Sequence, residues 1–349
     1  MINKFFERFL LKRYHNLNLA PRVELTNYQK NAIEKFKTKL KKGIYKKESV
    51  GCLCGSKKSF DFASLDRFSI PCKTKLCLNC GLFRISPRLD FESNNSFYKF
   101  DYRNIYIGDN YNLEQFFYFQ KLQGKKILNY VNDYLPLNNE CVVFEVGCGA
   151  GGILMPFKDA NHKVFGCDLG KDYLDFGIDK GLDLYNGDIE TLSKKPKCDL
   201  IILSHVLEHF MHPFEEIKKM KSYLKQGGMI YIEVPGAREA YKQFGADLLN
   251  YFQNAHIFNF TLENLTYFMN REGFRLVKSN HSIQAIYVKD ENLKITNNNF
   301  KVKKLIFYIY FHELLRKLGF PVVLLYPKTY IRNILKKLNI LNFYRNINS

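Results

Sequence analysis

One stretch, VVFEVGCGAGG at residues 142–152, constrains the fold of this chain more than any other. Its first five residues are apolar apart from Glu145, and three of them are β-branched, which is typical of a buried strand. Glycines follow at 147, 149, 151 and 152, and Ile153-Leu154-Met155 then makes a suitable helix start. A strand, a glycine turn and a helix start form the first half of a nucleotide-binding βαβ unit, because glycines let the backbone approach a ligand.

Two kinds of ligand fit this glycine turn. Gly147, Gly149 and Gly152 satisfy the G-x-G-x-x-G fingerprint of dinucleotide-binding domains. Glu145 with Gly147, Gly149 and Gly151 equally fits the E-x-G-x-G-x-G turn of methyltransferases that use S-adenosylmethionine. A glycine-rich turn without any ligand is the third interpretation.

Alternating strands and helices follow the turn. Strands are expected at 142–146, 163–167, 182–185, 199–203, 229–234, 274–278 and 283–288. Helices are expected between them, one over Pro213–Leu224 and another beginning at Thr261. Seven strands with intervening helices predict a doubly wound α/β sheet.

Residues at the strand ends distinguish the two ligands. Asp168 lies 19 residues after Gly149, where an acid binds ribose hydroxyls in either case, whereas Asp188-Ile189 suits an adenine ring. Three further segments are Leu207-Glu208-His209 after the fourth strand, Leu224–Gly228 before the fifth, and Ala255-His256 with Phe260-Thr261 after it. In this succession, residues 140–290 resemble the class I S-adenosylmethionine-dependent methyltransferases, which have a Rossmann-like fold. A dehydrogenase would leave Asp188 without a role.

The resemblance implies S-adenosylmethionine as the cofactor. Glu145 and the turn Gly147–Gly151 would hold its methionine part, Asp168 the ribose, and Asp188 with Ile189 the adenine. The full set of expected cofactor-binding residues is Glu145, Gly147, Cys148, Gly149, Gly151, Asp168, Leu169, Asp188, Ile189 and Ser204.

Three histidines are the candidates for catalysis. Methyl transfer depends mostly on alignment of donor and acceptor, but a hydroxyl acceptor also benefits from a base, and histidine suits that task near neutral pH. His209 is the first candidate because it follows the fourth strand, and His205 and His256 are the others. The alternatives are that His209 orients the following helix together with Glu208, and that His256 packs in the core.

Five cysteines between residues 51 and 80 indicate a separate small module. Cys77-Leu78-Asn79-Cys80-Gly81 has the C-x-x-C-G form of half a zinc ribbon, and Cys52-Leu53-Cys54-Gly55 is one residue short of the other half. We expect Cys52, Cys54, Cys77 and Cys80 as structural zinc ligands. There are two alternatives: Cys72 serves as a substitute ligand, or the ribbon keeps its shape without metal.

The segment 51–107 contains an FY…YR…Y stretch around Tyr98, Tyr102 and Tyr106. This segment is similar to the N-terminal ribbon and aromatic stretch of methyltransferases in sugar and surface-polysaccharide pathways. That resemblance implies a sugar acceptor, either a nucleotide sugar or a surface or lipid-linked glycan, with O-methylation favoured over C-methylation. The alternatives are an RNA or other nucleic-acid methyltransferase, and a non-catalytic scaffold with the same fold at a membrane.

The positive charge lies at the two ends of the chain. Residues 1–50 hold 13 Lys and Arg against 4 Asp and Glu, residues 292–349 hold 11 against 1, and the middle is balanced. A nucleic-acid acceptor is therefore disfavoured. The expected divisions are a basic helical extension (1–50), the ribbon-like module (51–107), the methyltransferase domain (108–290) and a basic amphipathic extension (291–349).

Both basic ends are expected to form amphipathic helices. Ile2, Phe5, Phe6, Phe9 and Leu10 have helical spacing near the start, and Ile331, Ile334, Leu335 and Leu338 share a helix face near the end. Such helices suit an anionic membrane surface, or else they pack on the core or on a second copy. Without a signal peptide or a run of roughly 20 apolar residues, we expect a cytoplasmic protein with peripheral contact at the inner membrane face.

Overall fold

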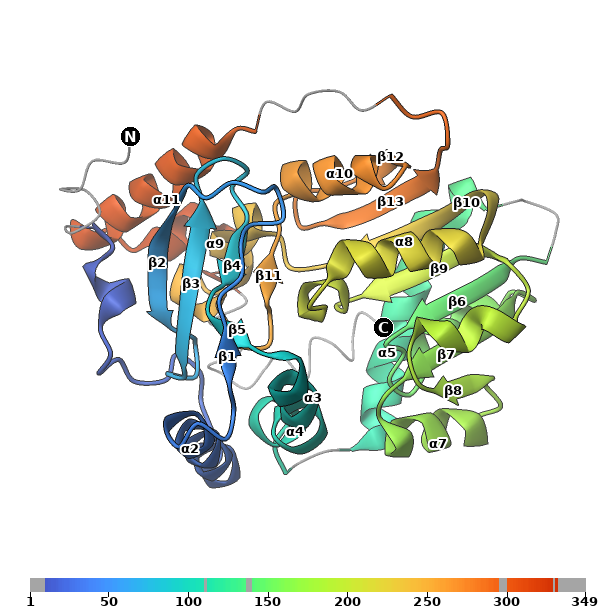
Figure 1. Cartoon of the computed structure of the whole chain (residues 1–349), viewed down its shortest axis with the longest axis horizontal. Coiled ribbons are helices and arrows are strands. Elements are labelled where there is room, and N and C mark those ends of the chain that lie inside the picture. The colour runs from blue at the N-terminus through green and yellow to red at the C-terminus, as the bar shows by residue number, and fades with distance from the viewer. Residues whose placement is uncertain (1–9, 110–111, 136–139, 295–299, 329, 332–349) are drawn as a thin grey trace. The chain divides into compact units, whose positions relative to one another are not determined.

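A computed structural model of the chain describes residues 10–109, 112–135, 140–294, 300–328 and 330–331 (Figure 1). The described residues form two compact units. Unit 1 comprises those of 1–106, 236–261 and 300–349, and unit 2 those of 107–235 and 262–299. Residues 236–261 therefore group with the two ends of the chain, which differs from the continuous 108–290 domain expected from the sequence.

Unit 2 is built on a seven-stranded sheet with the order β12-β13-β10-β9-β6-β7-β8. Strands β6 to β10 are parallel neighbours, and β13 pairs antiparallel with both β10 and β12. The strands are β6 (Val142–Val146), β7 (Lys163–Asp168), β8 (Leu184–Asn186), β9 (Cys198–Ser204), β10 (Leu224–Glu233), β12 (Phe274–Ser279) and β13 (Gln284–Lys289). The sequence predicted a doubly wound, Rossmann-like sheet, and the observed mostly parallel sheet fits that fold. The strand ends differ from the prediction by up to five residues.

Helices precede or connect these strands and cover the faces of the sheet (Figure 1). They are α5 (Leu113–Val131), α6 (Met155–Asp159), α7 (Lys171–Asp179), α8 (Pro213–Tyr223) and α10 (Leu262–Arg271). The chain proceeds from β6 to β7 and β8 on one side, and then returns to place β9 on the other side of β6. This reversal is a topological switch point, and open α/β sheets bind ligands at the carboxyl ends of the strands there.

Unit 1 contains a four-stranded antiparallel sheet with the order β11-β4-β3-β2 and a small pair, β1 with β5. The strands are β1 (Lys47–Glu48), β2 (Ser59–Leu65), β3 (Pro71–Cys77), β4 (Phe83–Ile85), β5 (Arg88–Leu89) and β11 (Phe258–Asn259). The helices are α2 (Asn27–Lys41), α3 (Phe91–Phe100), α4 (Tyr102–Tyr106), α9 (Ala240–Gln243) and α11 (Val302–Lys317).

Tyr98, Tyr102 and Tyr106 line up as their spacing suggested, although Asp101 interrupts the helix between α3 and α4. Successive ring centroids are 4.9 Å apart. The Tyr98 hydroxyl donates to the Ala255 carbonyl at 3.4 Å, and the Tyr106 hydroxyl accepts from the Ala255 N–H at 3.2 Å. These aromatics therefore bind the 236–261 segment within unit 1.

Most of the two expected amphipathic end helices lies outside the described residues. That holds for Ile2, Phe5, Phe6 and Phe9 at one end and for Ile334, Leu335 and Leu338 at the other. Leu10 is described and is buried. Among the described residues, no helix has the length and apolar character needed to cross a membrane.

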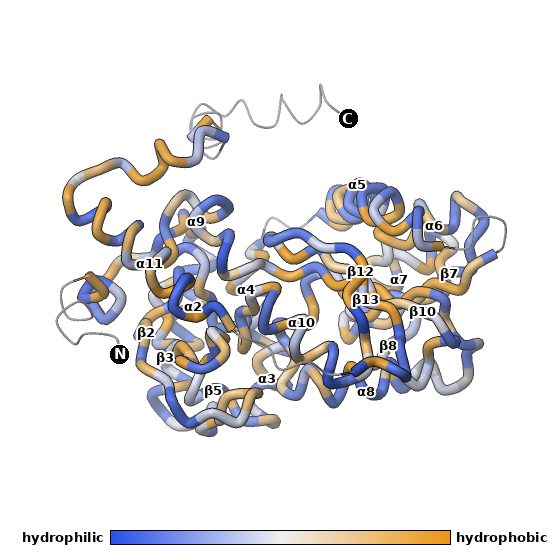
Figure 2. Tube along the Cα trace, turned by 90° about the horizontal axis from the view of Figure 1, so that it is seen from above, coloured by the Kyte–Doolittle hydropathy of each residue, from blue (hydrophilic) through white to orange (hydrophobic). Residues whose placement is uncertain are grey.

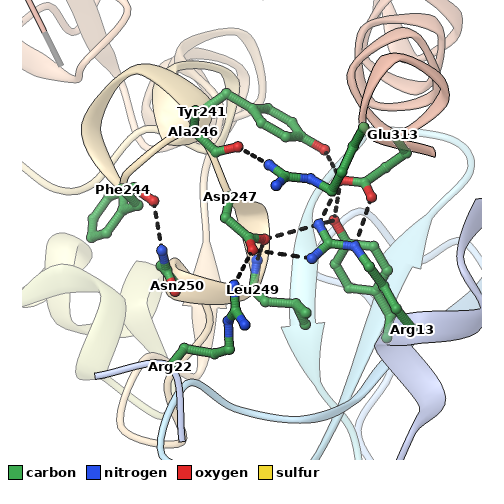
Figure 3. A network of polar contacts seen from close by, with 11 residues as sticks. Arg13, Arg22, Tyr241, Phe244, Ala246, Asp247, Leu249, Asn250 and Glu313 are labelled. Atoms are coloured by element: carbon green, nitrogen blue, oxygen red, sulfur yellow. Dashed lines mark hydrogen bonds and ion pairs between the residues drawn. The ribbon is translucent and has the colours of Figure 1, made fainter. Parts of the chain in front are cut away.

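A buried network of charges joins three distant segments of unit 1 (Figure 3). The Arg13 guanidinium donates to both oxygens of Asp247, at 2.8 and 3.1 Å, and to both oxygens of Glu313, at 2.7 and 2.8 Å. The hydroxyls of Tyr14 and Tyr241 also donate to Glu313, at 2.7 and 2.8 Å. Because Glu313 lies on α11, these bonds fix the C-terminal helix to the N-terminal segment and to the 236–261 segment.

Asp247 is ionised in this network despite its burial. Burial raises its pKa, but the hydrogen bonds and charge of Arg13 outweigh that effect and hold the pKa at about 2. Arg22 adds a further ion pair at 2.6 Å. Because the folded-state pKa is depressed, this stabilisation is complete above the unfolded-state value of about 4 and is lost as the pH falls toward the folded-state value.

Replacing Glu313 with Ala should loosen α11. The change leaves Arg13, Tyr14 and Tyr241 without their shared acceptor, and removing one partner of a buried ion pair costs about 3–5 kcal/mol. Amide hydrogen exchange should show the opening free energy of α11 falling by about that amount. The matched control is Glu34→Gln, since Glu34 forms an exposed pair with Lys37 in the same unit and should leave α11 unchanged. Equal protection of α11 in all three proteins would contradict this account.

Candidate active site

Polar side chains end the parallel strands of unit 2. Glu145 lies near the end of β6, and Asp168, Ser204 and Glu233 are the last residues of β7, β9 and β10. Because the carboxyl ends of parallel strands lie at one edge of a sheet, these four side chains come from the same edge, around the switch point.

The glycine turn after β6 is held in place by a residue that sequence reasoning missed. Gln120 of α5 accepts from the Gly152 N–H at 3.2 Å and donates to the Cys148 carbonyl at 2.9 Å. Gly147 has φ +68°, and a Cβ there would lie 2.6 Å from a methyl group of Val206, so only glycine fits. No local pattern marks Gln120, because its role comes from the packing of α5 on the turn.

Asp168 connects the ends of two strands. One of its carboxylate oxygens accepts from the Gly149 N–H at 2.9 Å, and the other accepts from the Gly170 N–H at 2.7 Å. The next residue, Leu169, is 73% exposed, which is unusual for a large apolar side chain. This edge therefore offers a fixed carboxylate beside an uncovered apolar surface.

Glu145 is the clearest sign of a ligand at this edge. Its side chain is 1% exposed, and its Oε2 atom has no hydrogen-bond partner among the described residues. Burial raises the pKa of Glu145 well above its usual range, and the nearby charge of Asp168 adds to that rise. A buried acid with one unpartnered oxygen fits a ligand that brings a cationic group, such as the amino group of S-adenosylmethionine, because the cation would favour the ionised form.

The remaining expected cofactor-binding residues differ in what they offer. Cys148 and Ile189 are buried, at 0% and 1% exposure. The Cys148 N–H donates to the Cys167 carbonyl at 3.0 Å, and its carbonyl accepts from Gln120 at 2.9 Å. Asp188 is exposed, and its Oδ1 accepts from the Glu190 N–H at 2.9 Å. The Ser204 hydroxyl lies 3.5 Å from Glu233.

Glu233, which sequence reasoning did not single out, organises the ends of β9 and β10. Its carboxylate accepts from Gln123 at 2.6 Å, from Gln284 at 3.1 Å and from the Tyr231 hydroxyl at 3.1 Å. Its carbonyl accepts from the His205 N–H at 2.8 Å. An acid at the end of a predicted parallel strand is a usable sequence signal, but its partners come from distant segments.

His205 has an unusual backbone and a carboxylate neighbour. Its φ is +57°, a left-handed conformation that is uncommon outside glycine and that tends to occur at functional sites. Its side chain is 55% exposed, and its Nδ1 lies 3.6 Å from Glu208. Burial lowers the pKa of His205, but Glu208 and then Glu233 outweigh that effect, so the pKa is raised above its ordinary value.

The other two candidate histidines lie in different units. His209 ends the short 3₁₀ helix Leu207–His209 of unit 2 and is half-buried. His256 belongs to unit 1, is 7% exposed, and its side chain contacts that of Gln253.

The four expected zinc ligands converge in unit 1. The Sγ atoms of Cys52, Cys54, Cys77 and Cys80 all lie within 4.8 Å of one another. The Cys52–Cys80 distance is 3.5 Å and the Cys54–Cys77 distance is 3.7 Å. Tetrahedral zinc with Zn–S bonds of about 2.3 Å requires sulfurs about 3.8 Å apart, so these four residues fit the metal.

The turn that contains Cys52 and Cys54 is one residue shorter than the turn that contains Cys77 and Cys80, which accommodates the shorter spacing of the first pair. The Gly81 N–H donates to the carbonyl of Cys77 four residues earlier, at 3.0 Å, whereas the Gly55 N–H donates to that of Cys52 three residues earlier, at 2.8 Å. Both glycines have positive φ, +74° and +76°, so each turn closes directly after its second cysteine. Cys72 is buried and lies outside the group of four.

Comparisons with known proteins give a family-model match and several similar solved structures. Residues 118–279 match the family model of a methyltransferase domain. The comparison with curated proteins gives no match. Similar solved structures include magnesium protoporphyrin IX methyltransferase from Synechocystis PCC 6803, at 17% identity and TM-score 0.41, covering 56% of this chain and 98% of that one.

Two further solved structures are similar. An S-adenosylmethionine-dependent methyltransferase from Archaeoglobus fulgidus has 23% identity and a TM-score of 0.39, covering 56% of this chain and 87% of that one. The 1,6-didemethyltoxoflavin-N1-methyltransferase of Burkholderia thailandensis has 15% identity and a TM-score of 0.38, covering 49% and 79%.

The match of residues 118–279 to the methyltransferase-domain model confirms the class of protein expected from the sequence. The chain is an enzyme, a methyltransferase. S-adenosylmethionine, the methyl donor expected from the sequence, agrees with a methyltransferase domain.

The pKa of His205 should lie above 6.5 when measured by NMR titration, because Glu208 and Glu233 favour the charged ring. Glu208→Gln should lower that pKa, because it removes the negative charge of Glu208 that favours the protonated ring. Because the folded-state pKa is raised, the stabilisation by this pair is complete below about 6.5 and is lost as the pH rises through the folded-state value. Glu215→Gln, beside the exposed His212, is the control and should leave His205 unchanged. A wild-type value at or below 6.5 would refute the assignment.

Proposed function

We propose that this enzyme methylates a hydroxyl group of a sugar, presented as a nucleotide sugar or as a surface or lipid-linked glycan. The observation that carries the proposal is the convergence of Cys52, Cys54, Cys77 and Cys80 in unit 1. It supports the resemblance of residues 51–107 to the ribbon of methyltransferases from sugar and surface-polysaccharide pathways. O-methylation is favoured over C-methylation because an exposed histidine beside an acid suits removal of a hydroxyl proton.

The cofactor site proposed for unit 2 uses the strand-end residues described above. Glu145 would bind the amino group of the methionine part beside the Gly147–Gly151 turn, Asp168 would accept from the ribose hydroxyls, and Leu169 would cover the adenine. Asp188, the backbone of Ile189 and Ser204 would complete the contacts. When bound, S-adenosylmethionine supplies a methyl group on a sulfonium, which needs alignment more than activation.

We propose His205 or His209 as the base that takes the proton from the acceptor hydroxyl. His209 is a candidate because it follows β9. His205 is a candidate because its side chain is exposed and lies beside a carboxylate. A well-placed base contributes about 10²- to 10⁴-fold to the rate.

The proposal is tested by methyl transfer. Purified full-length protein and methyl-labelled S-adenosylmethionine would be mixed with separated nucleotide-sugar, glycolipid and nucleic-acid fractions. Label should enter a sugar fraction. Asp168→Ala should weaken cofactor binding about ten- to a hundredfold, because it removes charged hydrogen bonds to the ribose.

The control for that experiment is Asp172→Ala, which changes another acid in the first turn of the next helix, α7. It should leave transfer unchanged. Label in the nucleic-acid fraction alone would refute the sugar acceptor while leaving the cofactor site intact. Cofactor binding without transfer to any fraction would favour the non-catalytic scaffold.

We also propose that the four cysteines hold one structural zinc ion. Elemental analysis of the full-length protein should give about one zinc per chain, and Cys77→Ser should lose it, because a three-ligand site binds zinc more weakly. Cys72→Ser is the matched control, since Cys72 is a buried cysteine of the same sheet outside the cluster. Zinc retained by Cys77→Ser but lost from Cys72→Ser would overturn this ligand set, and an equally zinc-free wild type would favour a ribbon without metal.

A further inference from the structure

Helix α11 is apolar on two faces, only one of which is buried. Val302, Leu305 and Ile309 lie on the buried face, together with the charged end of Glu313. Leu305 and Ile309 belong to the same hydrophobic core as Phe62 of β2 and other residues of the four-stranded sheet. This face accounts for how α11 is held within unit 1, but it does not account for the apolar residues opposite.

The opposite face carries large exposed hydrophobic side chains. Phe307 is 71% exposed, Phe311 44%, Leu314 40% and Leu318 74%. Their spacing of four, three and four residues places them in one line along the helix. Beyond α11 the chain stays largely hydrophobic in Figure 2, and Phe320, Leu324 and Leu325 are 40%, 47% and 40% exposed. We refer to the following exposed apolar residues as the outer stripe: Phe307, Phe311, Leu314, Leu318, Phe320, Leu324 and Leu325.

The exposed charged residues of the segment that carries the outer stripe are mostly cations. Lys301, Lys303 and Lys304 are exposed at the start of α11, and Lys317 and Lys328 are exposed toward the other end. Glu313 is the single acid of residues 292–349, and its carboxylate is buried against Arg13 on the opposite face. The segment therefore presents apolar side chains with flanking cations and contributes no anion of its own to that surface.

We propose that the outer stripe docks on an anionic membrane surface. Exposed aromatic and leucine side chains bordered by lysines suit the boundary between acidic headgroups and acyl chains, where each side chain meets its preferred surroundings. At 16 residues, α11 is about 24 Å long, and it would lie in the plane of the membrane without crossing it. The cations of this segment favour a lipid surface over a second copy of this chain, which would present the same cations. This inference goes beyond the proposed function and does not depend on the acceptor.

Vesicle flotation tests the proposal with the full-length protein. At physiological salt it should float with vesicles of phosphatidylcholine containing roughly one third phosphatidylglycerol, and much less with pure phosphatidylcholine. Phe307→Ser with Leu318→Ser should lower the partition coefficient at least about tenfold, because two exposed apolar anchors are removed. Lys303→Gln with Lys304→Gln should lower it about ten- to thirtyfold.

Phe91→Ser is the matched control, because Phe91 is 65% exposed in the same unit but lies on α3, outside the stripe. It should float like the wild type. Flotation that survives both double substitutions, or that Phe91→Ser reduces equally, would overturn the proposal. So would a wild-type protein that fails to float but forms dimers that the stripe variant does not, since the stripe would then be an interface between copies. Transfer to a soluble acceptor should be unchanged in the stripe variant, which separates this test from that of the proposed function.

Discussion

The proposed ligand-binding edge of unit 2 depends on the Asp168 carboxylate. By accepting from the N–H groups of Gly149 and Gly170, it fixes the turn after β6 to the turn after β7. Glu145 is meanwhile buried beside that turn with one oxygen lacking a partner among the described residues. Burying an acid with an unpartnered oxygen costs stability through desolvation, and a cationic ligand at this edge would offset that cost. The geometry of this turn thus accounts for Gly149 and for the acids Glu145 and Asp168.

The core of unit 2 could be predicted from the sequence because its signals are local. Parallel strands are continuous apolar runs bounded by glycine, proline or aspartate, and β6 has the bounds expected for it. The partners of the site could not be predicted in the same way. Gln120 and Gln123 lie on α5, far along the chain from the turn and from Glu233, so their contacts exist only after the helix packs.

Unit 1 shows a different limit of sequence reasoning. Its residues come from three segments, and the membership of 236–261 is set by contacts such as those of Ala255 with Tyr98 and Tyr106. Helix α11 has apolar residues around most of its circumference, so periodicity alone does not tell which face is buried. The bond between Glu313 and Arg13 decides it, and those residues are 300 positions apart. The sequence therefore indicated basic, apolar ends without indicating which side chains would stay exposed.

The cysteine cluster and the charge network act on the same helix. Val302 and Leu305 of α11 pack against the turn at Gly81, directly after Cys80, while Glu313 near the other end of α11 binds Arg13. The helix is thus held at one end by a turn that zinc would make rigid and at the other by buried ion pairs. A surface helix held at both ends loses little conformational entropy on docking, so its exposed face can bind with most of its apolar area. The contacts at Gly81 and the ion pairs of Glu313 that hold α11 within unit 1 therefore also make its outer stripe a pre-formed surface.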